Sequence, residues 1–440
     1  MGTEVESAWK TTIQSSLLIA VVCVLICAVL YVLYVSFVAN GVERFASSKA
    51  IAYLSTGALD RQHGDILLAQ TAVTTDLVPL NMNDIVFVKV DQYSARRLAN
   101  IVEDLYRSGV RYFLGGLTSG EILQLAPFLN THKDVVLVST ASTADVRKET
   151  TSHDDIPWDN QLFARRSTPV IKGFPFLDTY KDTVVTRTAS TADTRERSDG
   201  SIKGMMPNLY RFVPNDARAA PLFADTIVRN TPANKSSYAI LYNSSIVYSA
   251  QMRDLLAAEL TKLGKATKSY NLNTDHFYAE TAAKVATAAR ADNSTMILLV
   301  DDPDEAFVLI AMAKLPDVFV SDSLAFYHFA PKQMATLESL RVKSFTSWVL
   351  HEETYAFGHS VYRRPVSPFL SNVLAALWYV SDMYHSGTTT MSKVHVEKQK
   401  LFDSQGDCAL NHTVLAGVKD GQWTVMSGAM ENPYLPRFRY

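Results

Sequence analysis

The segment Val110–Asp145 constrains the fold of this chain most strongly, because its pattern alternates between strand and helix. Arg111–Leu114 and Asp134–Val138 are short apolar runs with turn residues on either side, which is typical of buried strands. Between them, Gly120–Leu129 carries its apolar residues at helical spacing. A strand, a helix and a second strand in this order predict two neighbouring parallel strands joined by a crossover helix.

Small hydroxyl residues follow each of these strands, and they are the first candidate binding residues: Thr118 and Ser119 after the first strand, and Ala141, Ser142 and Thr143 after the second. In a parallel sheet, both loops would lie at the carboxyl ends of adjacent strands, where open α/β sheets bind ligands. Hydroxyl groups and free backbone N–H groups at a helix start suit a carboxylate. The alternative, that Ser119 and Ser142 or Thr143 only cap helices, stays open on the local pattern alone.

The same alternation covers most of the chain and predicts two groups of strands and helices. In the first half, Lys49–Ser55 and Asp84–Val90 read as strands, followed by a helix over Ile66–Leu77 and an amphipathic helix over Tyr93–Ser108, respectively. The second half starts at Asn208–Pro214 and continues with the predicted strands Ser237–Tyr242, Ala266–Asn271, Thr295–Val300 and Asp317–Val320. Ser367–Tyr384 reads as a long apolar helix, and Val414–Met426 as a hairpin around Asp420-Gly421. Two such halves predict two lobes with a cleft between them.

An insertion interrupts the pattern at Val146–Pro207, which is rich in Thr, Ser, Asp and Arg. It contains an internal repeat, because Thr140–Arg147 recurs almost unchanged as Thr188–Arg195. We expect Thr140–Asp145 to line the cleft, since only this copy stands one helix away from Ser119. A loop of this length is either functional or disordered.

Composition excludes several classes of protein. The chain has 440 residues, a net charge of −2 and 48% hydrophobic residues, which indicates a globular protein with an additional apolar segment. There is no basic excess for binding nucleic acid and no zinc-ligand spacing among Cys and His. Neither a nucleophile-elbow pattern nor a phosphate-binding glycine loop occurs. We therefore expect no enzyme activity, no metal and no cofactor.

The apolar segment is Leu17–Val38, which carries no charge and is long enough to cross a bilayer. Its start holds Glu4, Glu6 and only one basic residue, and no good cleavage site follows it, unlike a secretory signal peptide. We therefore expect a retained single-pass anchor. Asparagine sequons occur only in the folded part, at Asn234, Asn243, Asn293 and Asn411, which favours an extracytoplasmic folded part carrying sugar if the cell is eukaryotic.

Six segments, taken in order, resemble the type I periplasmic binding proteins: GGLTSG, VLVSTASTADV, NLYRFVPNDARAAPLFADTIV, SYAILYNSSIVYSAQMRDLLAAELTKLG, VFVSDSL and GDCALNHTVLAGVKDGQW. They are most similar to the branched-chain amino-acid-binding and receptor-ectodomain branch of that family, which includes metabotropic glutamate receptor ectodomains. The resemblance covers roughly residues 49–430, apart from the insertion. It implies an α/β fold of two parallel-sheet, Rossmann-like lobes joined by a hinge, here preceded by one transmembrane helix.

The resemblance also implies a set of ligand-binding residues. Ser119, with Thr118, and Ala141 and Thr143 in the second loop would hold the α-carboxylate of the ligand. Tyr248 would cover the ligand, although Ser249 replaces the usual glycine after it. An acidic residue of lobe two would pair with the ammonium group, and the candidates are Asp301, Asp302 and Asp322. Helix capping is the alternative role for the acidic residues around Pro303, and core packing is the alternative for Tyr248.

We expect the following order along the chain: a short tail (1–16), the transmembrane helix (17–38), a tether (39–48), the ligand-binding region (49–430) and a final tail (431–440). Within the ligand-binding region, lobe one covers about 49–145, the insertion 146–207, lobe two mainly 208–345, and the crossing segments 346–430.

Two functions remain open. The first is a membrane-anchored binding protein or receptor-like ectodomain that closes its lobes on an amino acid or related zwitterion, signalling through a membrane partner or a homodimer. The second is a ligand-free structural or assembly subunit with the same fold, or a fragment of a larger receptor.

Overall fold

The computed structural model describes residues 49–56, 64–90, 95–142, 144, 206, 208–235, 237–272, 278–300, 302–327, 329–347, 357–358, 360–362, 369–389, 402, 406–408 and 413–427. The predicted anchor Leu17–Val38, its flanking segments and nearly all of the insertion lie outside these residues. Within the described part of the chain, no helix has the length and apolar character needed to span a bilayer.

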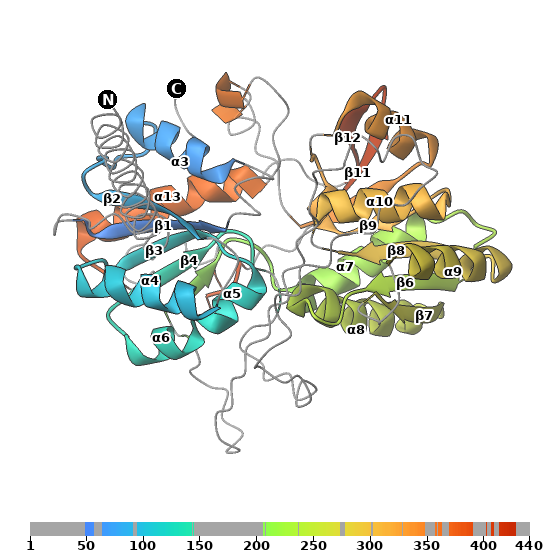
Figure 1. Cartoon of the computed structure of the whole chain (residues 1–440), viewed down its shortest axis with the longest axis horizontal. Helices are drawn as coiled ribbons and strands as arrows, with labels where there is room; N and C mark the ends of the chain where they lie inside the picture. Colours follow the sequence, from blue (N-terminus) through green and yellow to red (C-terminus); the bar gives the residue numbers. More distant parts are fainter. Residues whose placement is uncertain are drawn as a thin grey trace, which may run out of the picture. The chain divides into compact units, whose positions relative to one another are not determined.

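Lobe one is built on a parallel sheet (Figure 1). Across the described residues, its strands lie in the order β2 (Ile85–Val90), β1 (Ile51–Thr56), β3 (Tyr112–Gly116), β4 (Val136–Ser139) and β5 (Leu209–Arg211). β5 pairs with β4, so sheet one extends to Arg211, past the lobe boundary expected near residue 208. All residues of β3 and β4 are buried, as expected for strands with helices on both faces.

One glycine sets the spacing of two central strands in this sheet. Gly115 has φ of 141°, and a Cβ atom built on it would lie 1.9 Å from the carbonyl oxygen of Leu54 on β1. Any larger residue would therefore force β1 and β3 apart, in addition to the strain of that backbone conformation.

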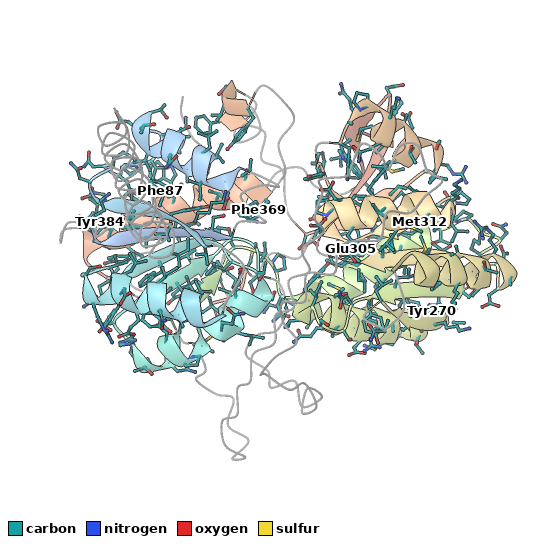
Figure 2. The ribbon with its side chains drawn as sticks, in the orientation of Figure 1. Phe87, Tyr270, Glu305, Met312, Phe369 and Tyr384 are labelled. Carbon is teal, nitrogen blue, oxygen red and sulfur yellow. The ribbon has the colours of Figure 1, made fainter. Side chains whose placement is uncertain are left out.

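Helices cover both faces of sheet one. α4 (Ala95–Arg107), α5 (Ser119–Gln124) and α6 (Ala126–Thr131) lie on one face, and α3 (Asp65–Thr74) and α13 (Phe369–Ser386) lie on the other (Figure 1). α13 comes from the C-terminal third of the chain, yet its apolar residues share one core cluster with Ile51, Tyr53 and Leu114 of the sheet. Phe369 and Tyr384, near its two ends, are labelled in Figure 2. Lobe one therefore needs both ends of the sequence.

Where the sequence predicted one helix over Gly120–Leu129, the structure has α5 and α6, separated at Leu125. Pro127 stands in the first turn of α6, where its missing N–H group costs no hydrogen bond. In the middle of a longer helix the same proline would remove a bond and clash with the preceding turn. The break leaves α5 as a short helix that begins at the end of the loop after β3.

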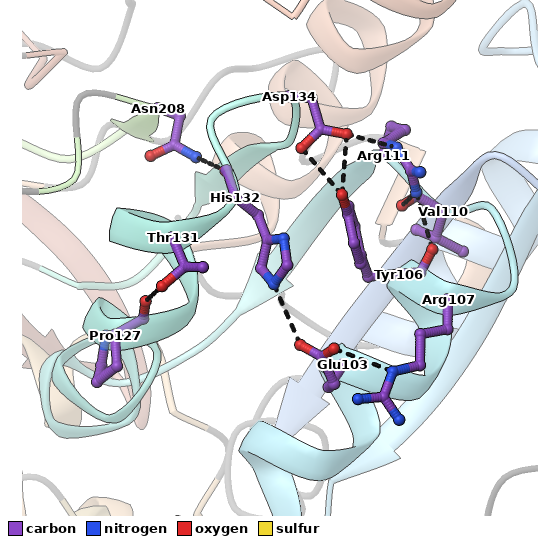
Figure 3. Close-up of polar contacts among 10 residues, drawn as sticks. All are labelled: Glu103, Tyr106, Arg107, Val110, Arg111, Pro127, Thr131, His132, Asp134 and Asn208. Carbon is purple, nitrogen blue, oxygen red and sulfur yellow. Dashed lines mark hydrogen bonds and ion pairs between the residues drawn. The ribbon is translucent and has the colours of Figure 1, made fainter.

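Polar contacts fasten α4 to the turn before β4 (Figure 3). The hydroxyl of Tyr106 donates to the carboxylate of Asp134, which also pairs with Arg111 at 2.9 Å. Nearby, Glu103 lies 3.2 Å from the ring Nε2 of His132 and pairs with Arg107 one turn further along α4. These contacts fasten α4 near the amino ends of β3 and β4, away from the carboxyl ends of these strands.

Lobe two contains a second, mixed sheet. Among the described residues its strands lie in the order β12 (Gln422–Ser427), β11 (Val414–Lys419), β10 (Lys343–Thr346), β9 (Phe319–Val320), β8 (Thr295–Leu299), β6 (Ser237–Tyr242) and β7 (Ala266–Asn271). The pairs from β10 to β7 are parallel, and β11 and β12 form an antiparallel hairpin at one edge. Asp420 and Gly421 at its turn both have positive φ, as a tight hairpin requires.

Two core clusters fill the two faces of this second sheet. α7 (Asp216–Arg229) and α8 (Val247–Lys262) pack on one face. α9 (Tyr278–Ala291), α10 (Pro303–Ala313) and α11 (Pro331–Ser339) pack on the other. Alternate residues along β6 and β8 point into the two clusters, which is the period-two pattern of a strand buried on both faces.

Candidate functional site

The two hydroxyl loops of lobe one contact each other at the carboxyl ends of β3 and β4. The Oγ–H of Ser142 donates to Oγ of Ser119 at 3.2 Å, and the backbone N–H of Ala144 donates to the same oxygen at 3.2 Å. Ser119 and Ser142 are 5% and 0% exposed. Since Ser119 accepts both bonds, its own hydroxyl hydrogen remains to be donated to an acceptor. A carboxylate oxygen is an acceptor of the right kind.

Thr118 has a different role, because it begins α5. Its hydroxyl accepts from the N–H of Glu121, while its own N–H and hydroxyl donate to Oε2 of Glu121 at 2.8 and 2.9 Å. This is a capping box, in which two residues satisfy each other's backbone groups. Thr118 is therefore the N-cap of α5, and its side chain is engaged within its own turn.

Glu121 is a buried carboxyl group directly behind this loop. Burial raises its pKa from 4.5 to about 7, and the hydrogen bonds from Thr118 act in the opposite direction by stabilising the charged form. Near neutral pH the Glu121 carboxyl group is therefore partly protonated. Because this group accepts the hydrogen bonds from Thr118, the cap at the start of α5 depends on its protonation state.

The second loop is held from three sides. The N–H of Ser142 donates to Oγ of Ser139 at 3.1 Å, and the N–H of Thr140 donates to the carbonyl of Gly115 on β3. On the third side, the amide of Asn372 in α13 donates to the carbonyl of Thr140 at 3.4 Å. Ala141 is partly buried against the lobe-one core. Thr143, predicted to bind the carboxylate, lies outside the described residues.

In lobe two, Tyr248 lies in the first turn of α8, 7% exposed and packed in the core cluster of α7 and α8. The next residue, Ser249, stands where the resemblance implies glycine. Its Oγ accepts from the N–H of Asn243 at 2.8 Å and donates to the carbonyl of Leu299. The hydroxyl thus joins the ends of β6 and β8, which a glycine cannot do.

The acidic candidates of lobe two differ in their surroundings. Oδ1 of Asp302 caps α10 by accepting from the N–H groups of Asp304 and Glu305 at 2.8 and 3.0 Å. Burial, and then the neighbouring charge of Asp302, raise the pKa of Asp304 to about 6. Asp322 is 8% exposed and opens a short 3-10 helix. Asp301 lies outside the described residues.

Three functional candidates were missed in the sequence: Arg211, Asn215 and Asp407, which form one buried polar cluster with the loop after β4. Arg211 and Asp407 are 196 positions apart, so no local spacing links them. The available signal was that both lie in segments that resemble the binding-protein family, NLYRFVPND and GDCALNH.

The predicted sugar-attachment sites are not equivalent. Asn234 and Asn293 are exposed, and the side-chain amide of Asn293 donates to the carbonyl of Asn234. Asn243 is 2% exposed and its Oδ1 accepts from the N–H of Ser245, so its amide is less accessible than those of Asn234 and Asn293. Asn411 lies outside the described residues. Within the described part, no group of acidic, His and Cys residues is placed to hold a metal ion.

Many solved structures share this arrangement of two lobes. They include a leucine-binding protein, LivK, from Thermotoga maritima, which is 14% identical over 88% of this chain and 99% of its own length, with a TM-score of 0.59. The chain has the fold of the type I periplasmic binding proteins.

Two further structures with this fold hold different ligands. LivJ of Streptococcus pneumoniae in complex with isoleucine is 12% identical, covering 87% of this chain and 98% of its own, with a TM-score of 0.55. A solute-binding protein of R. palustris in complex with benzoate is 10% identical, covering 87% and 96%, with a TM-score of 0.59. No family model and no curated protein matches the chain at the sequence level.

Proposed function

We propose that this chain binds a small carboxylate ligand, an amino acid or related zwitterion, and closes its two lobes around it. The observation that supports the proposal is the contact between the two hydroxyl loops at Ser119. This oxygen accepts from Ser142 and Ala144, so its O–H can serve as a donor at the carboxyl ends of β3 and β4. Ligands of open α/β sheets bind at this edge.

Lobe two would supply the group that distinguishes an amino acid from a simple carboxylate. Asp302 and Asp322 both follow strands of the second sheet, Asp302 after β8 and Asp322 after β9. A negative charge from either would pair with the ligand's ammonium as the lobes close. Closure of this kind converts occupancy into a change of shape that a partner protein can read.

Calorimetry on the full-length chain with three probes tests this proposal. L-leucine and L-isoleucine carry both charges, whereas benzoate carries only the carboxylate. We expect the amino acids to bind more tightly than benzoate, because charge-assisted hydrogen bonds to the ammonium are worth about 1.5–3 kcal/mol each, or roughly ten- to hundredfold in affinity. Binding of neither class would contradict the proposal.

A second candidate function, a structural or assembly subunit, is favoured by a specific observation. Asp302 already satisfies two N–H groups of its own helix, and Thr118 is engaged by Glu121. Groups that already make local hydrogen bonds have less capacity for a ligand, although both bonds of Asp302 use only Oδ1. Absence of binding, together with a defined stoichiometry with a copurifying protein, would favour this second function.

We also propose that Leu17–Val38 anchors the chain in a membrane, with the folded part on the extracytoplasmic side. The support is the length and lack of charge of this run. Protease protection of the folded part in sealed membranes tests the topology. In a eukaryotic cell, a glycosidase-sensitive band that disappears when Asn234, Asn243, Asn293 and Asn411 are all changed to Gln would support it. A protease-accessible cytosolic domain would contradict it.

A further inference from the structure

A buried ion pair joins the last strand of lobe one to a segment near the C-terminus. Nε of Arg211 donates to Oδ1 of Asp407 at 2.7 Å, and the terminal nitrogen Nη2 donates to Oδ2 at 2.6 Å. Both side chains are essentially inaccessible, at 0% and 1% exposure. This is the two-pronged geometry that fixes a guanidinium in one orientation.

The third nitrogen of the guanidinium contacts the candidate binding loop. Nη1 of Arg211 donates to the carbonyl oxygen of Ala144. The N–H of Ala144 donates to Ser119, so both backbone groups of this residue are held, one by Arg211 and one by the hydroxyl that we propose contacts the ligand. The position of the loop after β4 therefore depends on where Arg211 is held.

Asp407 is in turn bonded to the segment that leaves lobe one for α7. Nδ2 of Asn215 donates to Oδ2 of Asp407 at 3.3 Å, and Oδ1 of Asn215 accepts from the N–H of Ala217 as the N-cap of α7. The backbone also pairs here, because the N–H of Arg211 donates to the carbonyl of Gly406 at 2.9 Å. A Cβ at Gly406 would lie 2.5 Å from the carbonyl of Leu209, so this close approach requires glycine.

Stability alone is a weak explanation for this arrangement. Removing two charges from water costs about as much as their attraction returns, and apolar residues of similar volume often replace a buried pair without loss. What an apolar replacement cannot do is donate a hydrogen bond to the carbonyl of Ala144. That hydrogen bond fixes the backbone of the loop after β4 and adds nothing to the packing of the core.

We propose that Arg211 is a positioning residue: its guanidinium, held by Asp407, sets Thr140, Ala141, Ser142 and Ala144 of the loop after β4 in the conformation that binds the ligand. The link from Asp407 through Asn215 to the start of α7 places the same ion pair between the loop and the first helix of lobe two. The expected change in ligand affinity rests on the function proposed above, whereas the expected change in loop conformation does not.

A double-variant experiment separates positioning from stability. Arg211→Met and Asp407→Leu are made singly and together in the full-length chain. Each single variant leaves one buried charge unpaired and should melt well below the parent. The double variant should recover most of that loss, since no charge remains unpaired, but it still lacks the donor to Ala144.

Two readouts follow the loop. Hydrogen exchange of the Ala144 amide, measured without ligand, should be about tenfold faster in the double variant, the change expected for losing one charge-assisted hydrogen bond. The affinity for L-leucine should fall by about the same factor. An exchange rate and an affinity equal to those of the parent in the stabilised double variant would overturn the proposal.

A matched control pair lies in lobe two. Nε of Arg341 donates to Oδ1 of Asp317 at 2.9 Å, and Nη2 to Oδ2 at 2.5 Å, the same two-pronged geometry, with Arg341 62% exposed. Arg341→Met with Asp317→Leu should change neither readout. Loop exchange or leucine affinity that responds equally to this control would also overturn the proposal.

Two outcomes remain interpretable. If the parent binds no leucine, the proposed function fails, and the exchange rate of Ala144 still decides whether Arg211 positions the loop. If the single variants fail to fold, Arg211→Lys replaces them. A lysine keeps the charge next to Asp407, but its single ammonium cannot donate to Asp407 and Ala144 in the same fork geometry. Loop exchange should again rise, and parent-like exchange would contradict the proposal.

Discussion

The two lobes place polar residues at the same edge of their sheets but use them differently. In lobe one, Ser119, Ser142 and Ala144 are joined by hydrogen bonds that run between two loops. In lobe two, Asp302 bonds to the start of its own helix, and Ser249 bonds to the ends of two adjacent strands. A place at the carboxyl edge of a parallel sheet is thus insufficient evidence of a binding role. The local contacts decide which groups remain available to a ligand.

The largest expected effect concerns Glu121 behind the lobe-one loop. Its pKa is raised from 4.5 unfolded to about 7 folded, so the folded state binds the proton more tightly. The stabilisation is therefore complete below about pH 4.5 and is lost as the pH rises through 7. Relative to Glu121→Gln, the parent should lose about 3 kcal/mol of unfolding free energy over that range.

Urea titrations of the parent and of Glu121→Gln at several pH values measure this difference. A gap between the two proteins that stays constant from pH 4.5 to 8 would contradict the raised pKa. Lobe two offers a comparison in Asp304, whose pKa is raised to about 6, so Asp304→Asn should show the same sign over a narrower range.

Ser119→Ala should produce the next largest effect, because it removes the acceptor of two donors at once. Leaving the buried N–H of Ala144 and the hydroxyl of Ser142 without this acceptor should cost about 1–3 kcal/mol of stability. Leucine affinity should fall as well, since the proposed donor is gone. Ser142→Ala is the control, as it leaves Ser119 bonded to Ala144. An unchanged melting temperature for Ser119→Ala would show that the contact between the loops carries little energy.

Asp302 can be tested for both of its possible roles with two substitutions. Asp302→Ala should destabilise the protein by about 1 kcal/mol through loss of the helix cap, whereas Asp302→Asn should be nearly neutral because asparagine caps equally well. If Asp302 also pairs with a ligand ammonium, Asp302→Asn should weaken leucine binding and spare benzoate binding. Equal effects on both probes would assign Asp302 to capping alone.

Thr143→Ala should have the smallest effect on stability and a clear effect on binding. A loop hydroxyl contributes little to a core, so the free energy of unfolding should stay within about 1 kcal/mol of that of the parent. Leucine affinity should fall roughly tenfold if this hydroxyl contacts the carboxylate. Binding equal to the parent would remove Thr143 from the site.

Much of the fold follows from apolar runs of the right length. The bounds predicted for β6 and β7 coincide with those in the structure, because β6 is an apolar run and β7 begins soon after the turn residue Gly264. α11 and β10 were missed. β10 is only Lys343–Thr346, and what makes it a strand is pairing with β9 and β11 rather than its own sequence.

The candidate site divides in the same way. Ser119 and Ser142 could be predicted because each follows a strand directly, and strand order brings their loops together. The capping role of Asp302 was visible as an alternative from Pro303 beside it. Arg211 and Asp407 could not be paired from the sequence, since their contact depends on how a distant segment returns to lobe one.

The origin of α13 has a consequence for synthesis. Sheet two can assemble β6 to β10 from one continuous stretch, Ser237–Thr346, as soon as that stretch leaves the ribosome. Lobe one, although it begins first, has only α3 on this face of sheet one until Phe369–Ser386 has been made, some 300 residues after Ile51, so the part that α13 covers stays exposed. A nascent chain stalled before Phe369 should therefore hold the parallel part of sheet two without its β11–β12 hairpin, together with a first lobe that lacks α13.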